Sequence, residues 1–169
     1  MERIKIVVDA DVLIHFSEVN YLALLPDIFT EYDYVVLSTV YNEIKSVKTT
    51  LDKVCQLRKN ISVNEFRPTG EMMREYAILT STYGKGESAC MAYCRFTNNV
   101  VGSSNLKDIK DYCNENKITY LTTLDFLYYA WQRGKLSEKE VDDAIEELIS
   151  KNHKVPRTKI KEYTPTAQL

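Results

Sequence analysis

The chain has 169 residues, of which 44% are hydrophobic and 27% are charged, and its formal net charge is −2. This balance predicts one ordinary domain with enough chain to bury a core, because five glycines and four prolines are too few for a fibrous or disordered protein. No stretch approaches the roughly 18 uncharged apolar residues of a membrane span, and the first apolar run stops at Asp9, too early for a signal peptide. We therefore expect a cytoplasmic protein and no membrane partner.

Short β-branched runs alternate with helical patterns and capping signals along the chain. Ser38 or Thr39 is expected to cap the second helix. Gly134 is expected to end the helix at 123–133. In chain order, we expect a strand at 4–8, a helix through Phe16, a strand at 34–37, helices over 40–47 and 50–59, a weak strand at 61–66, helices at 71–82 and 87–93, a strand at 99–102, a helix at 105–116, a strand at 118–121, and helices at 123–133 and 137–151.

This alternation predicts an α/β fold with a mostly parallel central sheet, and no repeat or linker marks a second domain. We place one domain at residues 1–152 and a basic C-terminal tail at residues 153–169. Residues 151–161 carry five Lys or Arg and no acid, which leaves a net charge of −7 on the rest of the chain. Such a tail is either a solvated segment or an arm that contacts phosphate or an acidic partner.

Four acidic side chains follow predicted strands or turns, where a parallel sheet forms its sites. Asp9 ends the first strand, and a carboxylate there costs desolvation unless backbone N–H groups or a cation compensate it. Asp11 either points into the same cleft or caps the following helix. Glu43 lies beside the apolar stripe of its helix, and its spacing alone favours an exposed position. Glu87 begins a helix after two glycines, and its only role could be to stabilise that helix through the helix dipole.

Polar residues follow the later strands too. Ser104 and Asn105 come after the strand at 99–102, where a parallel-sheet enzyme projects groups into its site, and both are neutral. Asp108 lies one helical turn further on, and Asp125 begins the helix after the last strand. Both acids could simply be first-turn helix residues.

A parallel sheet would bring these acids to one edge, where they would repel one another and raise each other's pKa values. A hard divalent cation such as Mg²⁺ or Mn²⁺ relieves that repulsion and prefers oxygen ligands. A site of this kind can activate water for an in-line attack on a phosphodiester.

Several motifs along the chain, taken in sequence order, resemble those of the PIN-domain nucleases, in particular the VapC-like toxins and their small prokaryotic relatives. Residues 6–14 (IVVDADVLI) resemble the opening motif of that family, in which a strand ends in an acid and an apolar helix follows. The segments that resemble those bearing the second and third acids are residues 40–44 (VYNEI) and 84–92 (GKGESACMA). Residues 120–127 and 133–137 resemble the C-terminal half of one PIN subgroup, so the likeness covers most of residues 3–151.

The resemblance implies a PIN-like three-layer α/β/α fold and a Mg²⁺- or Mn²⁺-dependent endoribonuclease that hydrolyses single-stranded RNA. It further implies a toxin paired with an antitoxin protein, and a homodimer. By position, Asp9, Glu43 and Glu87 would be metal ligands or would orient water, with Asp11 in support.

One departure from the family pattern concerns its fourth acid. The corresponding stretch here reads Ser103-Ser104-Asn105, so Asn105 would hydrogen-bond water, with Ser104 in support, while Asp108 or Asp125 would replace the lost charge. The alternative interpretation is a catalytically degenerate PIN-like module that binds RNA or a protein partner. A phosphatase of the haloacid-dehalogenase type, suggested by Asp9 and Asp11, is less well supported because its later acid pair is missing from a strand end.

Overall fold

The structure is a computed structural model that describes residues 3–169. Within this range the strands form a single five-stranded parallel sheet in the order β3-β2-β1-β4-β5. The strands are β1 (Lys5–Val8), β2 (Asp33–Leu37), β3 (Ile61–Asn64), β4 (Val100–Gly102) and β5 (Tyr120–Leu121). The expected α/β class with a parallel sheet is therefore confirmed.

Helices follow and separate these strands. The bounds are α1 (Ala10–Glu18), α2 (Leu25–Ile28), α3 (Ser38–Glu43), α4 (Lys48–Leu57), α5 (Gly70–Leu79), α6 (Lys85–Thr97), α7 (Leu106–Glu115), α8 (Thr123–Gln132) and α9 (Glu138–Ser150), with 3₁₀ turns at η1 (Leu22–Leu24) and η2 (Ile160–Glu162). Within residues 3–169, none of these helices has both the length and the apolar character needed to cross a membrane.

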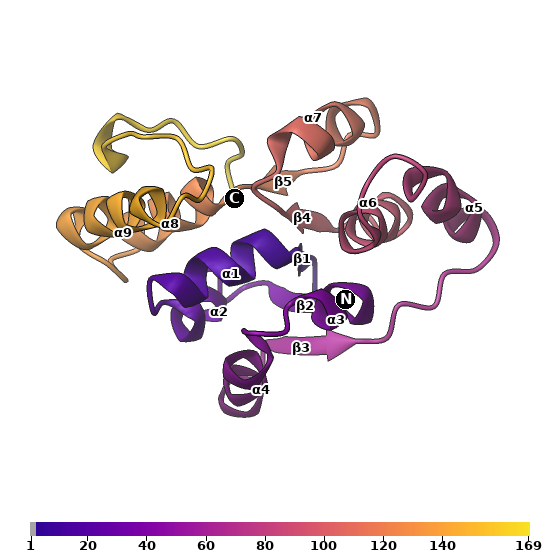
Figure 1. Ribbon diagram of the computed structural model, residues 1–169, viewed down its shortest axis with the longest axis horizontal. Coiled ribbons are helices and arrows are strands. Elements are labelled where there is room, and N and C mark those ends of the chain that lie inside the picture. Colours follow the sequence, from indigo (N-terminus) through magenta and orange to yellow (C-terminus); the bar gives the residue numbers. More distant parts are fainter. Residues whose placement is uncertain (1–2) are drawn as a thin grey trace.

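After their first residues, Lys5 and Asp33, the strands β1 and β2 are apolar because helices cover both faces of the sheet. Three of the four residues of β1 and four of the five residues of β2 are buried. Helix α6 packs on β1, β2 and β4, with α5 against its outer side, whereas α8 packs on β5 and contacts α1 and α2. Figure 1 shows α5 and α6 on one side of the strands and α1, α8 and α9 on the other, which gives the three-layer α/β/α arrangement expected from the resemblance.

The register of the sheet sets up one edge for chemistry. Val8 at the end of β1 pairs with Gly102 at the end of β4, and β5 pairs with β4 through the same Gly102. The residues that follow β1, β4 and β5 therefore emerge side by side at the carboxyl edge of the sheet, where open parallel sheets place their ligands.

The second expected helix is shorter than the sequence pattern suggested. Helix α3 ends at Glu43, because Ile44 leaves the helical conformation, and a turn then joins it to α4. Neither expected cap operates here: Leu37 is the N-cap residue, and the Ser38 hydroxyl instead accepts a hydrogen bond from the Phe66 N–H at 3.0 Å. The segment after β3 thus uses the hydroxyl that we expected α3 to use.

The structure confirms the capping signals expected in the last third of the chain. Gly134 has φ +67°, a left-handed conformation that favours glycine, directly after the end of α8. Ser137 and Glu140 form a reciprocal capping box at the start of α9. These local devices need no tertiary partner, which is why the sequence alone predicts them.

Residues 153–169, which we call the C-terminal arm, pack back along the domain. In Figure 1 the arm runs over α8 and α9 and ends beside β5. Ile160 is fully buried, and its N–H donates to Asp142 of α9 at 2.9 Å. Arg157, Lys159 and Lys161 of the arm form ion pairs with acids of α9, so the acidic surface that these cations contact belongs to the chain's own last helix. The division between residues 152 and 153 stays a prediction.

Candidate active site

Asp9 lies at the carboxyl end of the central strand and is buried. Its N–H donates to the carbonyl of Gly102 at 2.8 Å, which extends the pairing of β1 with β4 by one residue. Its Oδ1 accepts a hydrogen bond from the Ala10 N–H at 2.8 Å, so Asp9 is the N-cap of α1. The candidate cap was Asp11, but α1 begins immediately after the strand, and the last strand residue therefore takes that position.

Asp11 points from the first turn of α1 to the loop after β4. Its Oδ2 accepts a hydrogen bond from the Ser104 N–H at 2.9 Å. The Ser103 hydroxyl lies 3.3 Å from Asp9 Oδ2 and 3.4 Å from Asp11 Oδ2, between the two carboxylates. Since a serine hydroxyl has one hydrogen to donate, it can satisfy only one of these acceptors at a time.

Glu87, Asn105 and Asp108 meet across the gap between α6 and α7. Asn105 is the N-cap residue of α7, and Asp108 lies in the first turn of that helix. The Asn105 Nδ2 group donates to Glu87 Oε1 at 2.7 Å and to Asp108 Oδ2 at 2.8 Å. The neutral residue that departs from the family pattern thus uses both amide hydrogens to hold two acids together.

Glu43 reaches the same region from the end of α3. Its Oε1 accepts a hydrogen bond from the Gly86 N–H at 3.0 Å. A Cβ at position 86 would lie 2.6 Å from Glu43 Oε2, closer than real Cβ contacts come. Glycine at position 86 is therefore required for the Glu43 carboxylate to rest against the first turn of α6.

These carboxylates form an electrostatically unbalanced cluster. Burial, followed by the negative charge of Asp11, raises the pKa of Asp9 well above its ordinary value, and Glu87 and Glu43 add to the effect. Burial also raises the pKa of Asp11. Burial is the main cause that raises the pKa of Glu87 to about 7, against the opposing hydrogen bond from Asn105.

None of the ion pairs between residues 3 and 169 offsets this charge. The pairs described involve other acids, and none of them joins a Lys or Arg to Asp9, Asp11, Glu43, Glu87 or Asp108. His15 lines a cavity together with Asp11, Ser104, Asn105 and Lys154. Burial lowers the pKa of His15 to about 4, so that side chain is neutral at pH 7.

The donor set suits a hard divalent cation. All the acidic side chains offer oxygen, which Mg²⁺ and Mn²⁺ prefer. Over residues 3–169, no three His, Cys, Asp or Glu side chains form a ready group that could hold a metal. Mg²⁺ commonly binds through one or two carboxylates and keeps several waters, so the arrangement fits such an ion without a closed cage of side chains.

The chain matches a family model described as a PIN domain over residues 5–168. It belongs to the PIN-domain family. No curated protein matches the chain. PIN domains are generally nucleases and typically use divalent metals, so membership is consistent with a nuclease.

The structure of this PIN domain links most of the predicted site residues through direct contacts. Asp9 and Asp11 share the Ser103 hydroxyl, and Asp11 bonds to the backbone of Ser104. The other two groups are the Asn105 bridge between Glu87 and Asp108, and the contact of Glu43 with Gly86. These residues lie after β1, at the end of α3, after β4 or after the turn before α6, where the order of the motifs led us to expect them.

Asp125 has different contacts from the other candidates. It is fully buried, and its Oδ2 accepts from the Thr122 N–H at 2.7 Å in the capping box of α8. Its Oδ1 accepts from the Tyr163 hydroxyl at 2.8 Å and from the Thr166 N–H at 2.7 Å. The carboxylate therefore anchors the C-terminal arm.

The sequence reasoning missed a buried polar chain behind the acids. The Ser104 hydroxyl donates to Thr123 Oγ1 at 2.6 Å, and Thr123 Oγ1 lies 2.8 Å from His15 Nδ1. The His15 ring also packs edge-on against His153, with the centroids 4.8 Å apart. The position of Ser103 directly after β4 is a local signal that could have indicated its place between Asp9 and Asp11. No local signal indicates that His153 and Lys154 return to the carboxyl edge of the sheet.

Proposed function

We propose that this PIN domain is a Mg²⁺- or Mn²⁺-dependent endoribonuclease that hydrolyses single-stranded RNA. The observation that carries the proposal is the cluster of carboxylates at the carboxyl edge of the sheet, whose charge no Lys or Arg offsets in the described chain. Buried carboxylates without a cationic partner lower the stability of a fold. A bound cation would offset that cost, which is the reason to expect a metal-dependent activity at this site.

In this proposal the acids divide the work. Asp9, Glu43, Glu87 and Asp108 would hold the cation, and Asp11 supports them through its contact with Ser104. A bound Mg²⁺ or Mn²⁺ would supply positive charge to the phosphate and lower the pKa of water. Asn105 fixes the positions of Glu87 and Asp108, and its carbonyl oxygen can accept a hydrogen bond from the attacking water.

The wider proposal is a cytoplasmic homodimer that acts as the toxin of a toxin–antitoxin pair. Its support is the resemblance of the motifs around Asp9, Glu43 and Glu87 to those of VapC-like toxins.

The direct test is cleavage of a mixed single-stranded RNA pool by purified protein, with Mn²⁺, with Mg²⁺ and with EDTA. We expect cleavage with either ion and none in EDTA. Glu87→Gln should lower the rate at least about 100-fold, because it removes a charge that the cation requires. The matched control is Glu71→Gln, which alters an exposed acid in the first turn of α5 and should leave the rate unchanged.

A second candidate function rests on Asn105. If its amide merely satisfies Glu87 and Asp108, the protein is a silent module that binds RNA or a protein. Absence of cleavage by the wild type in every metal condition, with RNA binding retained in EDTA, would favour that function over the nuclease.

The contact of Glu43 with Gly86 gives a sharper prediction. Gly86→Ala should displace the Glu43 carboxylate and lower the cleavage rate about 100-fold, because small misplacements at reacting centres cost that much. Gly84→Ala is the control, since a Cβ there meets nothing within 4 Å. Single-turnover rates with Mn²⁺ would measure both variants, and equal rates for the two would contradict the assigned role of Glu43.

A further inference from the structure

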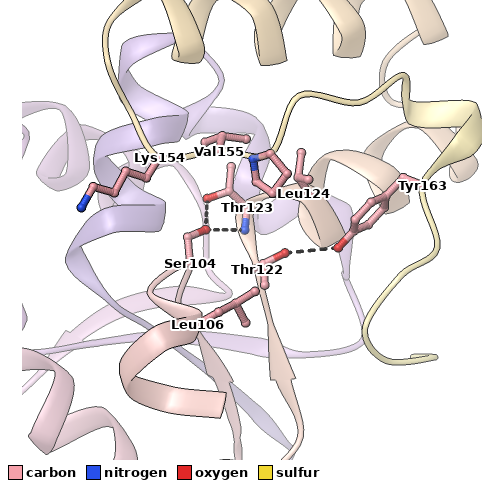
Figure 2. A pocket seen from close by; sticks show the side chains of 9 residues that line it. Ser104, Leu106, Thr122, Thr123, Leu124, Lys154, Val155 and Tyr163 are labelled. Carbon is pink, nitrogen blue, oxygen red and sulfur yellow. Dashed lines mark hydrogen bonds between the residues drawn. The ribbon is translucent and has the colours of Figure 1, made fainter.

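The C-terminal arm encloses a cavity beside the acidic cluster. Figure 2 shows this cavity between the loops that follow β4 and β5 and the start of the arm. Its volume is about 90 Å³. Most of the lining is apolar, and it comes from Leu106, Leu124, Val155 and Pro156, with hydroxyl groups from Thr122 and Tyr163.

This cavity adjoins a larger one at the acidic edge. The second cavity has a volume of about 260 Å³ and is lined by Asp11, His15, Ser104, Asn105 and Lys154. Ser104 and Lys154 line both cavities. A ligand could therefore extend from the acids to the apolar cavity past these two side chains.

Lys154 differs from the other cations of the arm. Arg157 pairs with Glu146 at 2.6 Å, and Lys159 and Lys161 pair with acids of α9. Lys154 is exposed and forms no ion pair with any described residue. It is also the only cation lining the larger cavity, since His15 is neutral there at pH 7.

An anionic backbone approaching this edge meets repulsion from Asp11 and its neighbours. A lysine placed at that edge offsets part of the repulsion, because phosphate contacts by Lys supply most of the affinity for nucleic acids. The apolar cavity beyond it suits the flat ring of a base, which can pack against the apolar side chains that line it.

We propose that the two cavities form a nucleotide subsite, in which Lys154 binds a phosphate of the RNA and the arm-enclosed cavity takes a pyrimidine base. This inference rests on the proposed ribonuclease function and adds a substrate preference to it. The base is placed in the cavity by its size: a dry cavity of about 150 Å³ holds benzene, so a cavity of about 90 Å³ takes most of a pyrimidine ring and leaves no room for the second ring of a purine.

The chain itself offers variants that fill the cavity or remove the charge. Leu106→Trp, with Leu106→Phe as a milder version, should obstruct the cavity from the first residue of α7, where Leu106 is 38% exposed and therefore tolerant of change. Lys154→Gln removes the cation. The matched controls are Leu57→Trp and Lys53→Gln on α4, at exposed positions away from the arm.

Binding would be measured in EDTA by fluorescence anisotropy with labelled hexamers of cytidine, uridine and adenosine. We expect the wild type to bind both pyrimidine hexamers more tightly than the adenosine hexamer. Obstructing the cavity should raise the Kd of the pyrimidine hexamers about tenfold and erase the preference. Lys154→Gln should weaken all three hexamers alike and reduce the slope of log Kd against log salt by about 1.

Cut sites mapped with Mn²⁺ would separate this inference from the proposed function. Wild-type cleavage without a pyrimidine preference, or with a preference that survives both Leu106 variants, overturns the subsite and leaves the nuclease intact. Pyrimidine-selective binding that the variants erase, in a protein that never cleaves, supports the subsite and overturns the nuclease. Absence of selective binding to any hexamer, or equal losses in the α4 controls, also overturns the subsite.

Discussion

Asp9→Asn should lower RNA cleavage by about a thousandfold or more and leave the fold intact. The carboxylate is buried at the end of the central strand, among the charges of the cluster, so its loss removes a main attraction for the cation. The amide oxygen can still accept the hydrogen bond from the Ala10 N–H, which preserves the cap of α1. Single-turnover cleavage with Mn²⁺ would measure the effect.

The same variant should be more stable than the wild type in EDTA. Burial raises the pKa of Asp9 in the folded state, so the folded protein holds a proton that the unfolded chain releases near its ordinary value of 3.8. Wild-type stability therefore falls as the pH rises above that value. Asparagine has no such cost, and we expect a melting temperature a few degrees higher at pH 8.

The control for both measurements is Asp111→Asn, at an exposed position of α7. It should change neither the rate nor the melting temperature. Cleavage at the wild-type rate by Asp9→Asn would show that Asp9 is not a catalytic residue. A lower melting temperature would show that the Asp9 carboxylate stabilises the fold.

Asp125→Ala should cost about 3–5 kcal/mol of unfolding free energy, the largest effect on stability that we expect. The substitution removes the acceptor, itself fully buried, of three hydrogen bonds, whose donors are the backbone N–H groups of Thr122 and Thr166 and the Tyr163 hydroxyl. It also breaks the capping box of α8 and releases the arm from the domain.

Urea unfolding would measure this loss, and Tyr163→Phe provides the comparison. That variant removes one hydrogen bond to Asp125 and should cost only about 1 kcal/mol. Equal, small losses in both variants would show that the carboxylate is not the anchor of the arm.

The sheet could be predicted because its strands carry their own signal. Val7 and Val8 in β1, like Val35 and Val36 in β2, are buried on both faces and so lie in short apolar runs. Short elements such as α2 were missed because Leu25 and Ile28 are held by packing rather than by any helical period. The break after Glu43 was missed because Val47 continues the apolar spacing of α3 into a turn.

The candidate acids could be predicted in the same way, from their places after strands and turns. The contacts between them could not, because they join residues far apart in the chain. The Ser104 N–H meets Asp11 only because β4 lies beside β1. The two hydrogen bonds of Asn105 depend on how closely α6 approaches α7, which no local pattern records.

The pairing of β1 with β4 also determines when the carboxylate cluster can form during synthesis of the chain. The contact of Asp11 with Ser104 spans 93 residues, and the arm that carries Lys154 comes later still. A nascent chain that has not yet reached β4 carries Asp9 and Glu43 without the partners that hold the remaining acids in place. Because domains are synthesised from the N-terminus onward, this cluster assembles only after most of the polypeptide has left the ribosome.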